Sequence, residues 1–155
     1  MNALELINIG TKELQQKNIG TSRLDSELLL SKILNKKREE VLINLNQKIS
    51  KRDFSKYKNY IKRRSQKEPI AYILKEKEFW NKSFFVSSDT LIPRPETELL
   101  VEKLIEIFKD KQISILDIGT GSGCILISLL GELINSRGVG IDISKKALVV
   151  AKKNA

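Results

Sequence analysis

Three alternating glycines lie between two acidic residues in the second half of the chain. Gly119, Gly121 and Gly123 directly follow an apolar run, and Asp117 stands two positions before the first of them. Asp142 follows the last glycine at the spacing of about 20 residues that nucleotide sites use between their turn and their acid. Glycine lets a backbone turn sharply and approach a ligand without a Cβ in the way. The pattern therefore predicts a nucleotide-type α/β site.

The spacing of the glycines distinguishes two classes of ligand. Dinucleotide sites require G-x-G-x-x-G/A, in which the last residue is small. When this pattern is counted from Gly119 or from Gly121, the last residue is Cys124 or Leu126, so neither register fits. The pattern D-x-G-x-G-x-G instead indicates S-adenosylmethionine, which carries no phosphate and has a cationic amino group.

We predict one role for each part of this loop. Its backbone contacts the methionine part of the ligand, Asp117 accepts from the amino group directly or through water, and Asp142 accepts from both ribose hydroxyls. Asp142 has an alternative structural role, as an acid at the start of a helix that Ser144 caps. Cys124 fits a small core residue better than a nucleophile. The predicted cofactor-binding residues are Asp117, Gly119, Thr120, Gly121, Ser122, Gly123 and Asp142.

The composition excludes several classes of chemistry within the chain. There is no histidine, so His-based general-base catalysis and His metal sites are excluded, and we expect no metal. The single cysteine, Cys124, cannot form an internal disulfide, which indicates a reducing cytoplasm. No apolar run approaches the roughly 20 residues of a membrane span, and the N-terminus lacks the form of a signal peptide. We therefore expect a cytoplasmic protein with no membrane partner.

Basic residues concentrate in the first half of the chain. The net charge of the whole sequence is +9, and the segment from Lys48 to Lys67 contains nine Lys or Arg residues and one acid, Asp53. Such a patch indicates an acidic protein partner or nucleic acid, although a solvated helix face has the same composition.

The first half of the chain has the periodicity of helices. Apolar residues recur at helical spacing over residues 3–17 and again after Ser22-Arg23-Leu24-Asp25, which has the form of a capping box. A short helix is expected over 39–45, and a longer one opens at a second box that begins with Ser50. A last short helix is expected over 69–74.

The second half alternates strands and helices. Two aromatic runs around Asn81-Lys82 predict a β-hairpin with these two residues in its turn. Pro95 at a first helical position predicts a helix whose apolar side includes Leu99 and Leu100. Beyond it we expect a buried strand over 113–118, a helix over 124–131, a strand over 139–143 and a helix after Ser144.

Several stretches of this sequence resemble one enzyme family. The resemblance covers essentially the whole chain, and its most specific part is the segment Ile92-Pro93-Arg94-Pro95-Glu96-Thr97-Glu98, whereas the glycine loop is common to many methyltransferases. The family is HemK/PrmC, the peptide chain release factor glutamine N5-methyltransferases. The similar stretches are Arg64, Glu68-Pro69-Ile70-Ala71-Tyr72-Ile73, Glu78-Phe79-Trp80, Leu91 to Glu98 and Asp117 to Gly123.

The resemblance implies an α/β protein: a helical bundle over 1–74 that docks class 1 peptide chain release factors, a β-hairpin linker over 75–90, and the first part of a Rossmann-like class I methyltransferase sheet over 91–155. It implies that the glycine loop and Asp142 bind S-adenosyl-L-methionine. It places Arg94, Pro95 and Glu96 near the substrate, with capping and packing of the next helix as their alternative role. The implied activity is methylation of a glutamine side-chain amide, in translation termination.

One motif of the family does not occur in the chain. Asn-Pro-Pro-Tyr, which in the family follows the fourth strand and holds the substrate amide, is missing from the sequence. We therefore expect the chain to be the front of a longer protein, to contain no catalytic residue of its own and not to methylate alone. Two alternatives stay open: an RNA or DNA base methyltransferase whose basic patch follows phosphates, and a non-catalytic fragment that only binds release factors.

Overall fold

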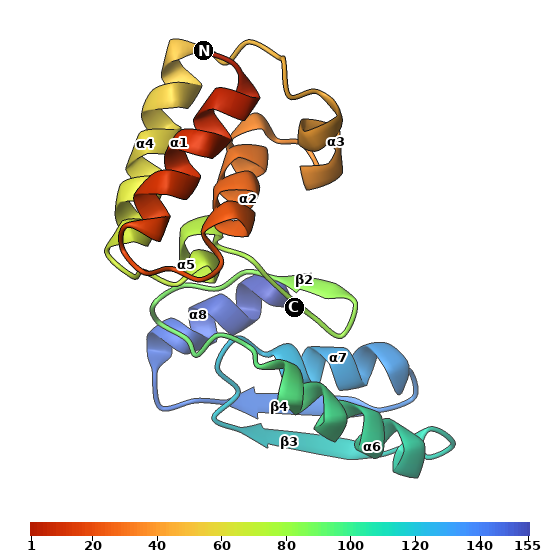
Figure 1. Cartoon of the computed structure of the whole chain (residues 1–155). Helices are drawn as coiled ribbons and strands as arrows, with labels where there is room; N and C mark the ends of the chain where they lie inside the picture. The colour runs from red at the N-terminus through yellow and green to blue at the C-terminus, as the bar shows by residue number, and fades with distance from the viewer. The chain divides into compact units, whose positions relative to one another are not determined.

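The computed structural model describes all residues, Met1 to Ala155, and divides them into two compact units (Figure 1). The first unit is Met1–Leu74 and the second is Lys75–Ala155. The hairpin that the sequence predicts as a linker lies inside the second unit; its role as a linker stays a prediction.

The first unit is entirely helical. Helices α1, α2 and α4 pack against one another around an apolar core that includes the fully buried Leu6, Ile7 and Leu29. Tyr57 and Ile61 are buried in the same core. The helices are α1 (Ala3–Gln15), α2 (Ser22–Leu34), α3 (Arg38–Ile43), α4 (Lys51–Ser65) and α5 (Ile70–Leu74).

Of the two predicted capping boxes, the first is wrong and only half of the second forms, because the Asp53 carboxylate accepts from the Ser50 hydroxyl and not from the Ser50 N–H. Ser50 does cap α4, since its hydroxyl accepts from the Asp53 N–H at 3.0 Å. For α2, however, the residue before the helix is Thr21, and Ser22 is already helical and buried. Asp25 does not reach back to the backbone as predicted, because it accepts from the Thr21 hydroxyl at 2.9 Å and from Arg64 at 2.7 Å.

The Asp25–Arg64 pair gives a structural role to Arg64, one of the residues that carry the resemblance. Asp25 is only 3% exposed, and a buried carboxylate of this kind requires a cationic partner. Arg64 Nε meets the Asp25 carboxylate, and its Nη1 donates to the Glu68 carbonyl at 3.1 Å. Arg64 therefore joins α2 to the turn before α5, a structural role within the helical unit.

The second unit contains two small sheets and three α-helices. Strands β1 (Lys77–Phe79) and β2 (Lys82–Phe84) form the antiparallel hairpin. Strands β3 (Ser114–Ile118) and β4 (Arg137–Ile141) are parallel, with Leu116 opposite Val139 and Asp117 opposite Gly140. The helical elements are η1 (Pro95–Thr97), α6 (Glu98–Phe108), α7 (Cys124–Glu132) and α8 (Lys145–Asn154). As predicted, Pro95 begins a helical segment, first as a 3₁₀ turn and then as α6.

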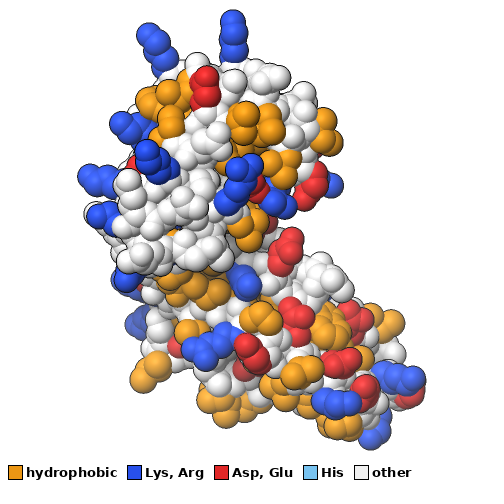
Figure 2. All heavy atoms as spheres, in the orientation of Figure 1, with side chains coloured by type: hydrophobic (Ala, Val, Ile, Leu, Met, Phe, Trp, Pro, Cys, Tyr) orange, Lys and Arg blue, Asp and Glu red, His pale blue; other side chains and the backbone are white.

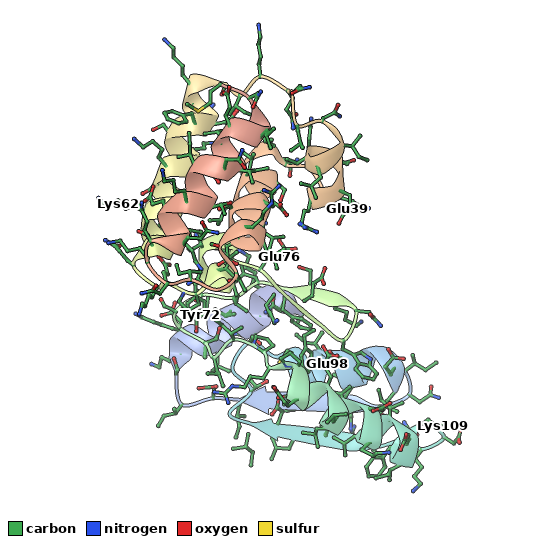
Figure 3. All side chains as sticks on the ribbon, in the orientation of Figure 1. Glu39, Lys62, Tyr72, Glu76, Glu98 and Lys109 are labelled. Atoms are coloured by element: carbon green, nitrogen blue, oxygen red, sulfur yellow. The ribbon has the colours of Figure 1, made fainter.

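The hairpin is confirmed, but its turn lies one residue earlier than predicted. Phe79 pairs with Lys82, so the two turn residues are Trp80 and Asn81. Both have positive φ, at 50° and 54°, as a type I′ turn requires. Trp80 is held there by long-range bonds: its N–H donates to Glu98 and its indole N–H donates to Glu132. Figure 3 shows Glu98 at the start of α6.

The parallel sheet is covered on one face and bare on the other. Ile115 packs with residues of α6 and α7, and Figure 1 shows α7 beside the sheet. On the opposite face four apolar side chains are exposed, which are Leu116, Ile118, Val139 and Ile141. The prediction of a buried strand over 113–118 is therefore wrong for this face, where Leu116 and Ile118 lie. Leu99 and Leu100 are exposed too, and the side of α6 that is buried centres on Val101.

The architecture is the predicted mixed one. A helical unit precedes a unit in which two parallel strands alternate with helices, as the sequence predicts. None of the helices has both the length and the apolar character that crossing a bilayer needs.

Candidate functional site

The glycine loop begins where β3 ends and is fastened to the end of β4. The N–H groups of Gly119 and Thr120 both donate to the Ile141 carbonyl, at 2.8 and 3.0 Å. Because β3 and β4 are parallel, their carboxyl ends meet at this edge of the sheet. The loop therefore lies at the place where α/β folds bind their ligands.

The three glycines occupy backbone conformations that other residues avoid. Gly119, Gly121 and Gly123 have φ values of 81°, 55° and 81°, all in the left-handed region. Gly123 also sets the start of α7, and its N–H donates to the Thr120 carbonyl at 2.8 Å. A Cβ on Gly123 would lie 2.9 Å from Ile127 Cδ1 and 3.4 Å from Ala151 Cβ, so glycine also permits the close approach of α8.

Asp117 is bound to the loop through Thr120. The Thr120 hydroxyl donates to Asp117 Oδ2 at 2.8 Å, and the Thr120 side chain is buried. The other carboxylate oxygen of Asp117 has no hydrogen-bond partner within the chain, and the residue is half-buried. Asp117 therefore keeps one oxygen to offer to a ligand.

Asp142 is bound to the loop through Gly121. Its Oδ2 accepts from the Gly121 N–H at 2.9 Å, and its Oδ1 accepts from the Ser144 N–H at 2.8 Å. The N–H groups of Ser144 and then of Gly121 stabilise the anion and lower the pKa of the Asp142 carboxyl, so it is ionised at neutral pH. A carboxylate has about four acceptor sites, so about two remain for a ligand.

The bond from the Ser144 N–H to Asp142 supports the alternative role of Asp142 as an acid at the start of a helix. Ser144 caps α8, and its hydroxyl accepts from the Ala147 N–H at 3.2 Å. Asp142 accepts from the N–H of this capping residue, so it does support the start of α8. The two roles are compatible because each uses different lone pairs of the same carboxylate.

The two acids flank one bend of the backbone. Asp117 binds Thr120 and Asp142 binds Gly121, which are consecutive residues. The structure thus brings together all seven residues predicted to bind the cofactor: Asp117, Gly119, Thr120, Gly121, Ser122, Gly123 and Asp142. A bend with a bare backbone and two carboxylates fits a small cationic ligand and opposes an anionic phosphate.

The residues predicted to lie near the substrate are not joined to this bend. Arg94 is extended and precedes η1, and Arg94, Pro95 and Glu96 are all exposed. Their side chains make no hydrogen bond or ion pair with the glycine loop. The capping alternative has support, since Pro95 starts the helical segment and the Thr97 N–H donates to the Arg94 carbonyl at 3.0 Å.

Two residues at the site were not predicted from the sequence. Gly140 lies under Thr120, and a Cβ there would meet Thr120 Oγ1 at 2.8 Å. Asn154 donates from its side-chain amide to the Ser122 carbonyl at 2.8 Å. A glycine in a strand is a general signal for a close approach, whereas Asn154 belongs to no motif.

Two protein families match the chain. Residues 5–74 match the family described as the PrmC N-terminal domain, and residues 109–155 match a family described as a methyltransferase domain. The two matches correspond to the helical unit and to the sheet with its glycine loop.

Three similar proteins are informative. The release factor glutamine methyltransferase of Buchnera aphidicola subsp. Schizaphis graminum is 46% identical over 132 residues, which are 85% of this chain and 48% of that protein. The protein of the same name from Leptospira interrogans is 42% identical over 154 residues, 98% of this chain and 54% of its own length. The bifunctional methyltransferase of Rickettsia typhi is 35% identical over an alignment of 169 positions, which covers 97% of this chain and 33% of that protein.

The chain spans about half the length of the first two relatives. Both relatives carry a name that the resemblance in the sequence anticipated, and one family match covers most of the first unit while the other covers residues 109–155 of the second. Over its matched residues the chain is therefore similar to release factor glutamine methyltransferases, with a match to the PrmC N-terminal domain followed by a match to a methyltransferase domain.

Proposed function

We propose that the chain forms the release-factor-docking and methyl-donor-binding parts of an enzyme that methylates the side-chain amide of a glutamine in a class 1 peptide chain release factor. The observation that carries this proposal is the glycine bend held between Asp117 and Asp142 at the carboxyl end of a parallel sheet. The relatives named release factor glutamine methyltransferase support the choice of substrate.

S-adenosylmethionine is the donor that this bend fits. The unpartnered oxygen of Asp117 accepts from the cationic amino group, and the remaining lone pairs of Asp142 accept from the ribose hydroxyls. The loop backbone from Gly119 to Gly123 contacts the methionine part, since no Cβ stands on its glycines. When bound, this cofactor supplies a methyl group on a positively charged sulfur.

The residues of this chain bind and orient, and none of them is assigned to the chemical step. An amide nitrogen is a poor nucleophile, so its methylation depends on groups that position it against the donor. The Asn-Pro-Pro-Tyr motif that does so in the family does not occur in these 155 residues. We propose that Arg94, Pro95 and Glu96 lie near the substrate, and that the reaction takes place in the cytoplasm, where the free thiol of Cys124 stays reduced.

Titration calorimetry with S-adenosylmethionine tests the donor. The wild-type chain is expected to bind it, and Asp142→Ala is expected to bind it at least tenfold more weakly, because two ribose bonds and the support of Gly121 are lost. Lys109→Ala, an exposed change in the same unit, serves as the control. Binding of NAD or ATP in preference to S-adenosylmethionine, or no heat with any of the three, would overturn the proposal.

A turnover assay separates an enzyme from a binding fragment. A release factor incubated with radiolabelled S-adenosylmethionine is expected to gain no label from the 155-residue chain alone. A form extended to the length of the relatives and containing Asn-Pro-Pro-Tyr is expected to label it, and a release factor whose acceptor glutamine is replaced serves as the control. If the extended form binds the release factor but never labels it, the non-catalytic alternative is correct.

The surface of the first unit supports an acidic protein partner. Lys51, Arg52, Lys56, Lys58 and Lys62 of α4 are all exposed and have no ion-pair partner, whereas Arg63 and Arg64 are paired with Glu68 and Asp25. Figure 2 shows Lys and Arg side chains gathered over α4, and Figure 3 shows Lys62 on its outer side. We propose that this cationic face of α4 steers the release factor to the helical unit.

Charge reversal on this face tests the partner. The double variant Lys56→Glu, Lys62→Glu is expected to slow association with a release factor severalfold at low salt, and the difference is expected to shrink as salt is added. Reversal of Lys109 and Lys111 in the second unit is the matched control. If the α4 variant instead abolishes tight binding of tRNA or rRNA fragments in a gel shift and leaves release factor binding unchanged, the nucleic-acid alternative is correct.

A further inference from the structure

Asn154, the last residue of α8, joins three segments that are distant in the sequence. Its Oδ1 accepts from the Phe85 N–H at 2.8 Å, and its Nδ2 donates to the Phe85 carbonyl at 3.0 Å. The same Nδ2 donates to the Ser122 carbonyl at 2.8 Å. One side chain therefore connects α8, the segment after the hairpin and Ser122 of the glycine loop.

Only an amide side chain of this length satisfies the three backbone groups. The site needs one acceptor for the Phe85 N–H and two donors for the two carbonyls, which is the inventory of an asparagine amide. Aspartate would keep the acceptor but turn an oxygen toward both carbonyls, and alanine would lose all three bonds. The backbone groups around residue 154 therefore require an asparagine at this position.

Asn154 is the one polar member of an otherwise apolar side of α8. Ala147, Val150, Ala151 and Asn154 follow one another at the spacing of a helix face, and Ala147 and Val150 are buried. Ala151 contacts the position of Gly123, and Lys153 lies over the ring of Phe85 at 3.4 Å from its centre. This face of α8 therefore packs on the loop, with its single amide aimed at the loop backbone.

The loop needs such a support because its residues are free to adopt many conformations. Three of its five residues are glycines, whose conformational entropy is the largest of any residue. The first part of the loop is held by the Ile141 carbonyl and the middle by Asp142. The Ser122 carbonyl, between Gly121 and Gly123, is held by Asn154.

We propose that Asn154 is a positioning residue for the methyl donor, which fixes the Ser122 carbonyl and so keeps the glycine loop in its binding conformation. The proposal rests on the proposed function for the identity of the ligand. A loop ordered in advance loses less conformational entropy on binding, so its support raises affinity without touching the ligand.

Two substitutions at this position test the proposal on the 155-residue chain. Asn154→Ala removes all three bonds, and Asn154→Asp keeps only the acceptor for the Phe85 N–H. Both variants lose the hydrogen bond to the Ser122 carbonyl. Both are therefore expected to weaken S-adenosylmethionine binding about five- to tenfold in calorimetry, as the loss of one supporting hydrogen bond predicts. A new carboxylate would by itself attract a cationic ligand, so weaker binding by Asn154→Asp reports the lost support. Lys152→Ala, on the exposed side of α8, is the control.

Amide hydrogen exchange measured by NMR gives a readout that needs no ligand. Exchange at Gly121 and Gly123 is expected to accelerate in both Asn154 variants at a temperature where circular dichroism shows them folded, and to stay unchanged in Lys152→Ala. Unchanged exchange and unchanged affinity in folded variants would overturn the proposal. If Asn154→Ala does not fold, Asn154→Asp decides. If the wild-type chain binds no S-adenosylmethionine, the proposed function fails, and the exchange data alone decide whether Asn154 fixes the loop.

Discussion

At the scale of single residues, the site consists of neighbouring pairs in which a glycine leaves room for a polar side chain or offers its N–H to one. Thr120 can donate to Asp117 because Gly140 leaves room for it on the neighbouring strand. Asp142 holds the N–H of Gly121, a residue whose φ of 55° favours glycine. Each predicted ligand-binding residue thus depends on a small residue next to it.

Replacing Gly140 by alanine is expected to displace Thr120. The new Cβ would lie 2.8 Å from Thr120 Oγ1, closer than real Cβ atoms approach, and at a tight 3.1 Å from Thr120 Cβ, so the Thr120 side chain would have to shift. We expect a loss of about 1–3 kcal/mol in the free energy of unfolding, as for other overpacked sites, measured by urea denaturation. Gly20→Ala is the matched control, because nothing lies within 4 Å of its Cβ position. Equal effects of the two changes would contradict this account.

The stability contributed by Asp142 is expected to depend on pH. The N–H groups of Ser144 and Gly121 lower its folded-state pKa, so its contribution is complete above the unfolded value of about 3.9 and is lost as the pH falls through the folded value. An asparagine in place of this acid would turn its amide NH₂ toward one of the two N–H donors. The variant Asp142→Asn is therefore expected to have a lower free energy of unfolding than the wild type at pH 7. In urea denaturation, the difference between the two free energies is expected to narrow below about pH 4. A gap that is constant with pH would refute this assignment.

At the scale of elements, the sequence predicts an element well when the residues that stabilise it are close together in the chain. The glycine loop could be predicted because its three positive-φ positions are contiguous with the strand and helix that they join. The hairpin turn was misplaced because Trp80 rarely adopts positive φ, and it does so here through bonds to Glu98 and Glu132, 18 and 52 positions away. Asn154 could not be predicted, since its partners lie 69 and 32 positions away.

The observed turn predicts opposite effects of two substitutions at Asn81. Its φ of 54° is open to glycine at no steric cost, so Asn81→Gly is expected to be neutral or to stabilise the second unit. A β-branched residue is strained at this φ, so Asn81→Val is expected to destabilise the unit by about 1–3 kcal/mol. Thermal unfolding measures both changes. If valine is tolerated as well as glycine, Asn81 does not need a positive φ and this account of the turn is wrong.

At the scale of the whole molecule, the two units divide the work of the proposed enzyme. The helical unit has a buried core, paired internal charges and a cationic outer helix, which suit recognition of a partner. The second unit presents the donor-binding bend at one edge of its sheet. It also carries a bare apolar face, where Leu116, Ile118, Val139 and Ile141 are 60%, 76%, 61% and 45% exposed.

This bare face is expected to govern how the 155-residue chain behaves in solution. Contiguous apolar surface on a sheet binds hydrophobic dyes and associates with itself. We therefore expect strong fluorescence with anilinonaphthalene sulfonate and concentration-dependent sedimentation. Leu116 and Val139 are directly opposed in the register, so the double variant Leu116→Glu, Val139→Lys replaces an apolar pair by an ion pair across the strands. It is expected to lower both signals, while Ile43→Lys, at an isolated exposed position of the helical unit, leaves them unchanged. If the double variant keeps full dye binding, the face is not the cause, and the exposed apolar residues of α6, Leu99, Leu100 and Ile107, are the next to be changed.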